Sequence, residues 1–408
     1  MLTVKEALHI LLKKAPQVAE GDVVAISKAN GRVLAETQYS RVDVPNADNS
    51  AMDGYAIRFS DLKSPETVLA IRQRIPAGSL GTRLQNGEAA RIFTGAPLPE
   101  GADTVVRQEW CKVDGDQLRF IQLPQKKGES VRYRGEDVGI GALVLKKGTR
   151  LQPQHLGAAA SVGLVDLPVM RRLKVALMST GNELVAQDET LKPGQIYNSN
   201  RYILRGLLEN LGCEVTDFGI IADSLKATRI ALLEAASTGH DLILTSGGVS
   251  VGEEDHIKPA IEAEGRMHFW RVAVKPGKPL VFGEINESSG LPDSSATAII
   301  GLPGNPVSSF VTFLLFVRPY LLRMQGVDDV SAKSWLLRAD FNLDNPDERN
   351  EFLRARLNED GGLDLFGNQG SGVFSSTVWG DGLIDNPPGQ PIGKGDFVRF
   401  IPFSELLK

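Results

Sequence analysis

Three short segments rich in glycine and hydroxyl side chains each follow an apolar run that predicts a buried strand. They span residues 179–183, 245–252 and 301–309. A glycine has no side chain, so its backbone can approach a ligand closely, and free amides at the start of a helix attract anions. One such segment is more often only a tight strand-to-helix turn. Three of them at one edge of a sheet favour a site for a phosphate or a pterin.

Two lysines stand in the sequence Lys-Pro-Gly-Lys-Pro, directly after another predicted strand. They are Lys275 and Lys278. Because the prolines restrict the backbone, both ammonium groups can face one anion. A solvated turn explains the same pattern equally well. The segment is therefore a candidate for anion binding, with both interpretations open.

Acidic residues stand beside the glycine-rich segments. Mg²⁺ prefers oxygen ligands and retains water, so carboxylates next to a phosphate site indicate a magnesium ion. Asp223 has a second interpretation, because a single Asp at a helix start usually caps the helix, here at Ser224. Asp255 is harder to explain in that way, since it follows the second glycine-rich segment directly. The acidic candidates are Glu183, Asp223, Glu253, Glu254 and Asp255.

Composition excludes several classes of protein. The 408 residues carry a net charge of −5, which argues against nucleic acid as a partner, because phosphate backbones select basic faces. Cys111 and Cys213 form no CxxC pair, and the five histidines show no metal-ligand spacing. The longest strongly apolar run, 310–317, is far shorter than the roughly 20 residues of a membrane span. A cytoplasmic enzyme of two to four domains is expected.

The order of elements predicts an α/β domain between two β-rich regions. From about residue 172, strands alternate with helices, which indicates a parallel sheet with helices on both faces. The charge-rich segment 344–351 predicts a solvated turn without function. Expected strands are 173–178, 213–221, 241–245, 298–301, 351–357 and 397–401, with a strand or hairpin at 267–282; expected helices are 3–12, one from 153, 200–211, 224–236, 255–263 and one from 306.

Seven short motifs follow one another along nearly the whole chain, at residues 49–56, 94–97, 134–137, 179–184, 246–252, 275–279 and 302–308. A single motif is modestly specific, whereas the ordered set is highly specific. Together these motifs resemble one family, the MoeA molybdopterin molybdenumtransferases, which are also found as the E domain of gephyrin.

The resemblance implies an α/β multidomain protein of four domains. An elongated N-terminal domain comprises residues 1–39 and 151–168, and a β-rich domain is inserted at 40–150. Residues 169–326 form the molybdopterin-binding α/β/α domain of three layers, and 327–408 form a C-terminal β-barrel domain. In its implied reaction, molybdate enters the dithiolene of adenylylated molybdopterin, with Mg²⁺-dependent release of AMP. The implied assembly is a homodimer, and its implied partners are other molybdenum cofactor biosynthesis proteins and recipient molybdoenzymes.

The loops and the resemblance together predict the site residues. Asn305 is expected to cap a helix whose first residue is Pro306. Asn182 stands where many members of the family carry Asp. Predicted catalytic residues are Asp53, Thr94, Glu183, Asp255, Lys275 and Lys278, and predicted metal ligands are Asp223, Asp255 and Glu183. Predicted ligand-binding residues are Thr180, Gly181, Ser246, Gly247, Gly248, Ser250, Pro303, Gly304, Asn305, Pro306 and Ser308.

Two other functions stay open at this point. The first is a non-catalytic scaffold, because a gephyrin-like E domain also binds partner peptides. The second is a nucleotide pyrophosphatase that shares the molybdopterin-binding fold. Retention of Asp53, Asp255 and both lysines argues against the scaffold, and the β-rich insertion with residues 49–56 argues against the pyrophosphatase. AMP release from adenylylated molybdopterin, with and without molybdate, distinguishes the three.

Overall fold

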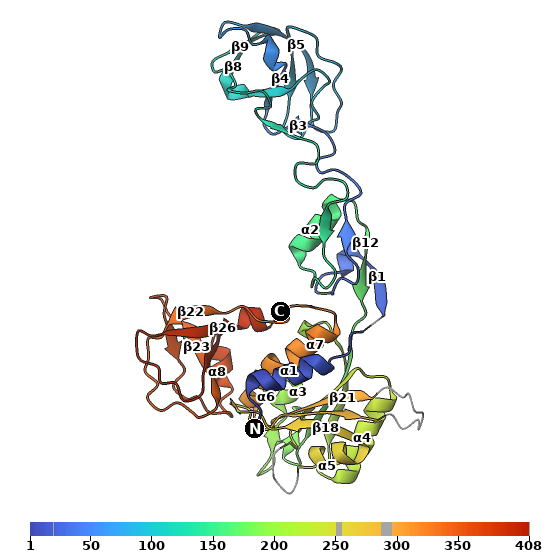
Figure 1. The fold of residues 1–408 in the computed structure, drawn as a ribbon, viewed down its shortest axis with the longest axis vertical. Coiled ribbons are helices and arrows are strands. Elements are labelled where there is room, and N and C mark those ends of the chain that lie inside the picture. Colours follow the sequence, from blue (N-terminus) through green and yellow to red (C-terminus); the bar gives the residue numbers. More distant parts are fainter. Residues whose placement is uncertain (19, 250–254, 287–295, 408) are drawn as a thin grey trace. The chain divides into compact units, whose positions relative to one another are not determined.

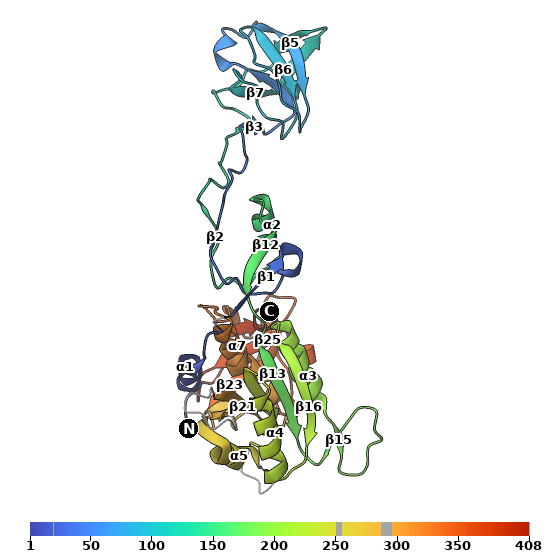
Figure 2. The same cartoon turned by 90° about the vertical axis from the view of Figure 1, so that its right-hand side faces the viewer.

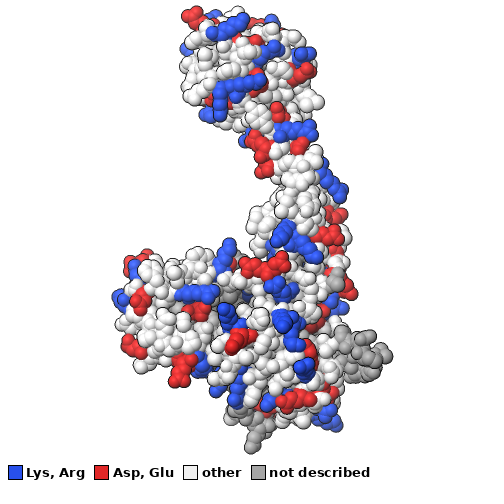
Figure 3. All heavy atoms as spheres, in the orientation of Figure 1, with Lys and Arg blue, Asp and Glu red and all other residues white. Residues whose placement is uncertain are grey.

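A computed structural model describes residues 1–18, 20–249, 255–286 and 296–407, and it divides into two compact units. The first unit contains Met1–Asp22, Gly31–Ala35 and Val169–Lys408, and the second contains Val23–Asn30 and Glu36–Pro168. Each unit is described by itself. On the face drawn in Figure 3, acidic and basic side chains are interspersed over both units.

The first unit is built on a six-stranded sheet of order β16-β13-β17-β21-β20-β18 (Figure 1). The strands are β13 (Lys174–Thr180), β16 (Glu214–Ile221), β17 (Leu242–Ser246), β18 (Gly265–Trp270), β20 (Val281–Ile285) and β21 (Thr297–Leu302). The four strands from β16 to β21 are parallel, whereas β20 pairs antiparallel with both β21 and β18. The expectation of a parallel sheet is therefore wrong at this edge, because β18 and β20 pair as the arms of a hairpin. Of the strand or hairpin expected at residues 267–282, the structure has the hairpin.

Helices cover both faces of this sheet. On one face, α4 (Leu225–Ser237) and α5 (Ile257–Glu264) pack over Ala176, Ile243 and Ile299. On the other, α1 (Val4–Lys14), α3 (Ser199–Asn210), α6 (Pro306–Thr312) and α7 (Arg318–Met324) pack over the alternate residues of the same strands (Figure 2). These strands are continuous apolar runs because both of their faces are buried. The predicted helices are confirmed, with ends shifted by one to two residues.

The first helix begins where the sequence encodes a cap. Thr3 accepts a hydrogen bond from the N–H of Glu6, and Glu6 accepts one from the N–H of Thr3. This capping box satisfies two of the donors that a helix start leaves unpaired. Ala7 and Leu11 of α1 are fully buried in the same core as α3 and α7. The predicted four-domain division groups this helix with residues 151–168, and that division stays a prediction.

One long apolar helix passes through the core of the first unit. Residues Pro306–Met324 comprise α6, a π-helical turn η4 (Phe313–Val317) and α7. In the described part of the chain this is the one helix that is long and apolar enough to cross a membrane, and 89% of its most apolar window is buried inside the protein. It is therefore accounted for as a core helix, which covers β21 and its neighbours.

The C-terminal part of the first unit is a second sheet of order β19-β23-β25-β26-β22, with β24 beside β23. Its strand β19 (Val274–Lys275) comes from the α/β part and runs parallel to the start of β23. The predicted strands at 351–357 and 397–401 are confirmed. Its other elements are β22 (Trp335–Arg338), β23 (Asn350–Leu357), β24 (Leu363–Leu365), β25 (Gly382–Asn386), β26 (Phe397–Pro402), α8 (Ser375–Trp379) and α9 (Phe403–Leu406).

The second unit holds a six-stranded sheet of order β7-β4-β6-β5-β9-β8. Its strands are β4 (Gly54–Ile57), β5 (Val68–Ile75), β6 (Glu88–Ile92), β7 (Thr104–Arg107), β8 (Cys111–Asp114) and β9 (Gln117–Phe120). Small apolar clusters line its two faces. The same unit contains the pairs β2 (Gln38–Tyr39) with β11 (Leu143–Leu145) and β3 (Asn49–Ser50) with β10 (Val131–Arg132), and the predicted helix α2 (Pro153–Ser161); β1 (Gly21–Ala25) pairs with β12 (Asp166–Met170).

Candidate functional site

A cavity of about 280 Å³ opens where the central parallel strands of the first unit end. All three glycine-rich loops contribute to its wall, as expected for the carboxyl edge of an open α/β sheet. Ten predicted site residues line it: Thr180, Gly181, Glu183, Asp223, Ser246, Gly247, Gly248, Asp255, Pro303 and Gly304. Ser250 lies outside the described residues. Leu184, Ile196, Asn200, Val249 and Pro279 also line the cavity and were not predicted.

Two glycines of the second loop pack against the first loop. Gly247 has φ +93°, and a β-carbon there would lie 2.5 Å from the carbonyl oxygen of Thr180. Gly248 has φ +66°, and its β-carbon would lie 2.8 Å from the Thr180 hydroxyl. A side chain at either position would strain the backbone and push the two loops apart. The glycines are thus required for the loops to meet.

Asn200, near the start of α3, joins the second and third loops. Its side-chain amide donates hydrogen bonds to the hydroxyl of Ser246 at 2.8 Å and to the carbonyl oxygen of Gly304 at 2.7 Å. Since the carbonyl can only accept, the amide orientation is fixed. Ser246 then accepts from Asn200 and keeps its own hydrogen for an acceptor. The sequence offers a weak signal for this residue, an Asn at a predicted helix start.

Asp223 does not cap α4. The cap is Ser224, whose hydroxyl accepts from the N–H of Ala227 at 3.2 Å. Asp223 instead accepts from the N–H of Asn182 at 2.6 Å, and Asn182 accepts in return from the N–H of Asp223 at 3.3 Å. This reciprocal pair ties the first loop to the turn before α4. Asp223 therefore stands in the cavity wall with a fixed orientation.

The three predicted metal ligands share one cavity but no tight cluster. Within the described residues, no group of three or more His, Cys, Asp or Glu side chains is arranged to hold a metal ion, and Glu253 and Glu254 lie outside that part. Glu183, Asp223 and Asp255 nevertheless line the same wall. Mg²⁺ is commonly held by one or two carboxylates together with water and substrate phosphates. The residues present fit an ion of that kind.

Hydrogen bonds to the loop between β24 and α8 hold the third glycine-rich loop in place. Asn305 occupies the N-cap position of α6, but its side chain makes no capping bond and instead donates to the hydroxyl of Ser371 at 3.1 Å. The expectation that Asn305 is the N-cap residue is therefore confirmed, although its side chain bonds elsewhere. The N–H of Val307 donates to the carbonyl of Ser371 at 3.1 Å. Pro306 is the first residue of α6 as expected, and Ser308 is buried within its first turn.

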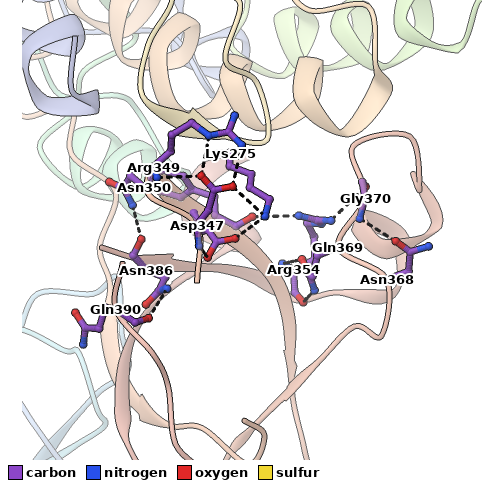
Figure 4. A network of polar contacts seen from close by, with 12 residues as sticks. Lys275, Asp347, Arg349, Asn350, Arg354, Asn368, Gln369, Gly370, Asn386 and Gln390 are labelled. Atoms are coloured by element: carbon purple, nitrogen blue, oxygen red, sulfur yellow. Dashed lines mark hydrogen bonds and ion pairs between the residues drawn. The ribbon is translucent and has the colours of Figure 1, made fainter. Parts of the chain in front are cut away.

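The Ser371 loop is anchored by a buried arginine. Arg354 is 1% exposed and donates to the carbonyls of Phe352 and Gly370 and to the hydroxyl of Ser376. Burial lowers the pKa of Arg354 to about 10. Gln369 exchanges two hydrogen bonds with the backbone of Arg354, as Figure 4 shows. A glycine-flanked serine is the only sequence signal that marks this loop.

Lys275 pairs with carboxylates of the C-terminal sheet. Its ammonium lies 3.0 Å from Glu351 and 3.3 Å from Asp347 (Figure 4). Burial disfavours the ammonium, but the two carboxylates outweigh that effect and raise the pKa of Lys275. Glu351 is 3% exposed, and Asp347 also forms a bidentate pair with Arg349. The prediction of a solvated turn at 344–351 is therefore wrong, because two of its acids neutralise Lys275.

Lys278 has a different environment from Lys275. It is exposed, and in the part of the chain that the structure describes it forms no ion pair. Neither lysine is among the residues that line the cavity, although Pro279 is. Of the two predicted anion-binding lysines, Lys278 is the one whose charge is available to a ligand.

Asp53 and Thr94 form one group in the second unit. Both the N–H and the hydroxyl of Thr94 donate to Asp53 Oδ1, each at 2.8 Å. These two bonds, the backbone one first, lower the pKa of Asp53, with a smaller contribution from the charge of Arg91. The residues are 41 positions apart in the sequence and are joined by the turns that follow β3 and β6.

Comparison with known proteins identifies the family to which this chain belongs. It is 37% identical to a molybdopterin molybdenumtransferase of Haemophilus influenzae, with 100% of each chain covered. It is 35% identical to one of a Nostoc species, covering 98% of this chain and 94% of that one. This chain belongs to the molybdopterin molybdenumtransferase family. Residues 2–163, 176–323 and 337–403 match, in order, the MoeA N-terminal region (domain I and II), a probable molybdopterin-binding domain and the MoeA C-terminal region (domain IV).

The fold agrees with this membership. A crystal structure of the molybdopterin biosynthesis protein MoeA from Pyrococcus horikoshii superimposes with a TM-score of 0.83 at 28% identity. The comparison covers 98% of this chain and 100% of that one. The expected multidomain α/β architecture of the family is thereby confirmed, since the whole chain takes part in the match.

The pairing of Lys275 leads to a prediction about stability. In Lys275→Ala, buried Glu351 loses its cation, and we expect the free energy of unfolding to fall by about 1–3 kcal/mol in urea denaturation. The loss should be below that of a fully buried pair, because the Lys275 side chain is 40% exposed. Adding Glu351→Gln should restore most of the lost free energy of unfolding. The single variant Lys278→Ala should leave the free energy of unfolding almost unchanged. A double variant as unstable as Lys275→Ala would show that the ion pair does not stabilise the unit.

Proposed function

We propose that this protein is a molybdopterin molybdenumtransferase, which inserts molybdenum from molybdate into the dithiolene of molybdopterin. One observation carries the proposal: three glycine-rich loops and three carboxylates line one cavity in a chain that matches named transferases along its full length. The backbone amides and hydroxyls of such loops suit an anionic group, and the carboxylates suit its cation. The reaction completes the molybdenum cofactor.

The proposed substrate is adenylylated molybdopterin, and the proposed products are the molybdenum cofactor and AMP. Release of AMP breaks a phosphoanhydride bond, so negative charge must be stabilised on the leaving phosphate. One or two of the carboxylates Asp255, Asp223 and Glu183 would hold Mg²⁺ together with the phosphates, and the ion would supply that stabilisation. Ser246 donates its hydroxyl hydrogen to a phosphate oxygen, because Asn200 already occupies its acceptor side. The chain needs no nucleophilic triad for this chemistry.

Molybdate is itself an anion and requires donors near the phosphate site. Lys278 is the better of the two lysines for this task, because Lys275 already faces Glu351 and Asp347. Ser250 was also expected to contribute but lies outside the described residues. We further propose a cytoplasmic location, with other molybdenum cofactor biosynthesis proteins and recipient molybdoenzymes as partners.

The direct test of the function is an assay of AMP release from adenylylated molybdopterin by the purified protein. We expect release that depends on both Mg²⁺ and molybdate, together with formation of the molybdenum cofactor, measured by its transfer to an apo-molybdoenzyme. Release of AMP without any need for molybdate would indicate a pyrophosphatase instead. A protein that binds the substrate but leaves it intact would be a scaffold.

Asp255→Asn tests the magnesium site. A neutral amide binds Mg²⁺ poorly, so we expect turnover to fall by about 100-fold at limiting Mg²⁺, with a smaller loss at saturating Mg²⁺. Circular dichroism should show an unchanged fold. Glu262→Gln on α5 is the matched control, because its side chain is 52% exposed and, among the residues that the structure describes, pairs only with Lys258 at 3.9 Å. Near-normal turnover of Asp255→Asn at limiting Mg²⁺ would contradict this assignment.

We also propose a homodimer in which two subunits supply one site. Asp53 and Thr94 belong to one compact unit, and Asp255 and the glycine-rich loops belong to the other. The family resemblance supports a dimer that combines these sets from different subunits. In a twofold dimer both composite sites are equivalent.

Mixing two inactive variants tests the shared site. Asp53→Asn and Asp255→Asn are combined after partial denaturation and reassembly, and mass spectrometry must show that mixed dimers formed. Half the dimers should then be mixed, each with one intact and one doubly altered site. About a quarter of wild-type activity should return if the sites are independent. No recovery in a sample that contains mixed dimers would place each site within one chain.

A further inference from the structure

We propose that Arg74, supported by Arg91, forms a binding site for a tetrahedral oxyanion on the second unit, beside Asp53 and Thr94. Candidate ligands are molybdate and a phosphate group of the pterin nucleotide, which share this chemistry. Only the natural identity of the ligand rests on the proposed function. The site itself rests on the arrangement of two guanidinium groups and two aromatic rings.

Guanidinium groups and rings alternate across three neighbouring strands. The Arg91 guanidinium lies 5.1 Å from the ring centre of Tyr55 and 4.7 Å from that of Phe93. The guanidinium of Arg74 lies 4.6 Å from the ring centre of Phe93. Sheet register produces this order, since Tyr55 on β4 and Arg74 on β5 are both paired with Arg91 on β6. Stacking fixes the planes of both guanidinium groups without using their N–H donors.

Arg91 is a positioning residue for the Asp53–Thr94 pair. It donates to the carbonyl of Gly54 at 3.2 Å and to the side chain of Gln108 at 2.6 Å. The N–H of Gln108 donates in turn to the carbonyl of Asp53 at 3.1 Å. Phe93, against which Arg91 stacks, directly precedes Thr94 in the chain. Arg91 therefore holds both predicted catalytic residues through their neighbours, and several of its donors are occupied.

Arg74 is held by the same stack but keeps its donors. Its side chain is exposed, and no ion pair or hydrogen bond engages it within the described residues. Arg72, on the same strand, has a carboxylate partner, Asp116, at 3.4 Å. A guanidinium that is oriented by an aromatic ring and lacks a carboxylate presents a planar set of donors to a ligand. That set matches two oxygens of a phosphate or a molybdate ion.

The two arginines of the stack differ in their acidic neighbours. Asp53 lies near Arg91, and Glu109 lies near Asp53. Asp53 already accepts two hydrogen bonds from Thr94. In the described part of the chain no carboxylate forms an ion pair with Arg74, so its charge remains available to an anion, although the protein as a whole carries a net charge of −5.

The test is a titration of the full-length protein with molybdate, inorganic phosphate and AMP, followed by nuclear magnetic resonance. The signals to follow are the backbone N–H of Thr94 and the side-chain Nε–H of the arginines, which separate this site from anion binding in the first unit. We expect at least one of the three anions to shift these signals, more strongly at low salt than at high salt. The most effective anion indicates whether the ligand is molybdate or a phosphate group.

Substitutions then assign the site. Arg74→Ala should weaken the affinity measured at Thr94 by about 10-fold, which is the loss expected for a charge-assisted hydrogen bond. Arg74→Lys should recover part of it, because charge is kept without the planar donor set. The matched control is Arg72→Ala, which should leave the affinity unchanged. Arg74 is exposed, so these variants should retain the wild-type circular dichroism spectrum.

Two outcomes separate this inference from the proposed function. If none of the anions shifts the Thr94 or arginine signals, or if Arg74→Ala binds as the wild type does, the oxyanion site is absent, whatever the activity of the enzyme. If binding depends on Arg74 while the wild-type protein releases no AMP, the site stands and the proposed reaction is wrong. Arg91→Lys provides a separate check on positioning. It keeps the charge near Asp53 but loses the paired hydrogen bonds to Gly54 and Gln108, so it should lower kcat more than it changes KM.

Discussion

The parallel register of β13, β17 and β21 is the constraint on which the candidate site depends. Ser179 pairs with Ser246, and Ser246 pairs with Leu302, so the three strands end in one row. The residues that follow begin the three glycine-rich loops at the same level of the sheet. The N–H of Gly247 donates to the carbonyl of Leu302 at 3.0 Å. The backbone hydrogen bonding between β17 and β21 thus continues into the second loop. A register shift of one residue in any strand would separate the loops.

Two kinds of contact convert this row of strand ends into a cavity. Small residues allow close approach, since a β-carbon at Gly247 or Gly248 would meet Thr180. Polar side chains then fix the separation, because Asn200 bridges Ser246 and Gly304 while Asn182 and Asp223 hold each other. The hydrogen bond from Asn200 to Ser246 is buried, where an unpaired partner costs about 1–3 kcal/mol, and the one to Gly304 is partly buried. The cavity is thus preorganised before any ligand arrives, which reduces the cost of binding.

The sequence predicts local features of this structure well. The alternation of strands and helices, the three glycine-rich loops and the helix ends all depend on residues that lie close together in the chain. The helix start at Pro306 is an example. Ten of the predicted site residues line one cavity, because adjacent parallel strands bring their carboxyl ends together. The assignment of catalytic and metal-binding roles to these residues remains a prediction.

Features that depend on distant pairing could not be predicted. Lys275 is neutralised by Glu351, which lies 76 positions later on the adjacent strand β23 of the same sheet. The lysine motif alone therefore overstates how much of its charge is available to a ligand. The hydrogen bond from the side chain of Asn305, the N-cap residue of α6, to Ser371 could not be predicted for the same reason. The stack of Arg74, Phe93 and Arg91 arises from cross-strand register, which no local pattern encodes. Sequence periodicity identifies faces and turns, whereas such pairs require the fold.

We propose that the three loops in register hold the phosphate group of a nucleotide. Hydrogen–deuterium exchange of the whole protein, with and without AMP and Mg²⁺, tests this proposal, because amides that bind an anion become protected. We expect slower exchange in peptides covering residues 179–184, 246–249 and 302–306, and a smaller effect in Asn200→Ala. Unchanged exchange in all three segments under saturating AMP, or protection confined to other parts of the first unit, would show that the loops do not hold the phosphate.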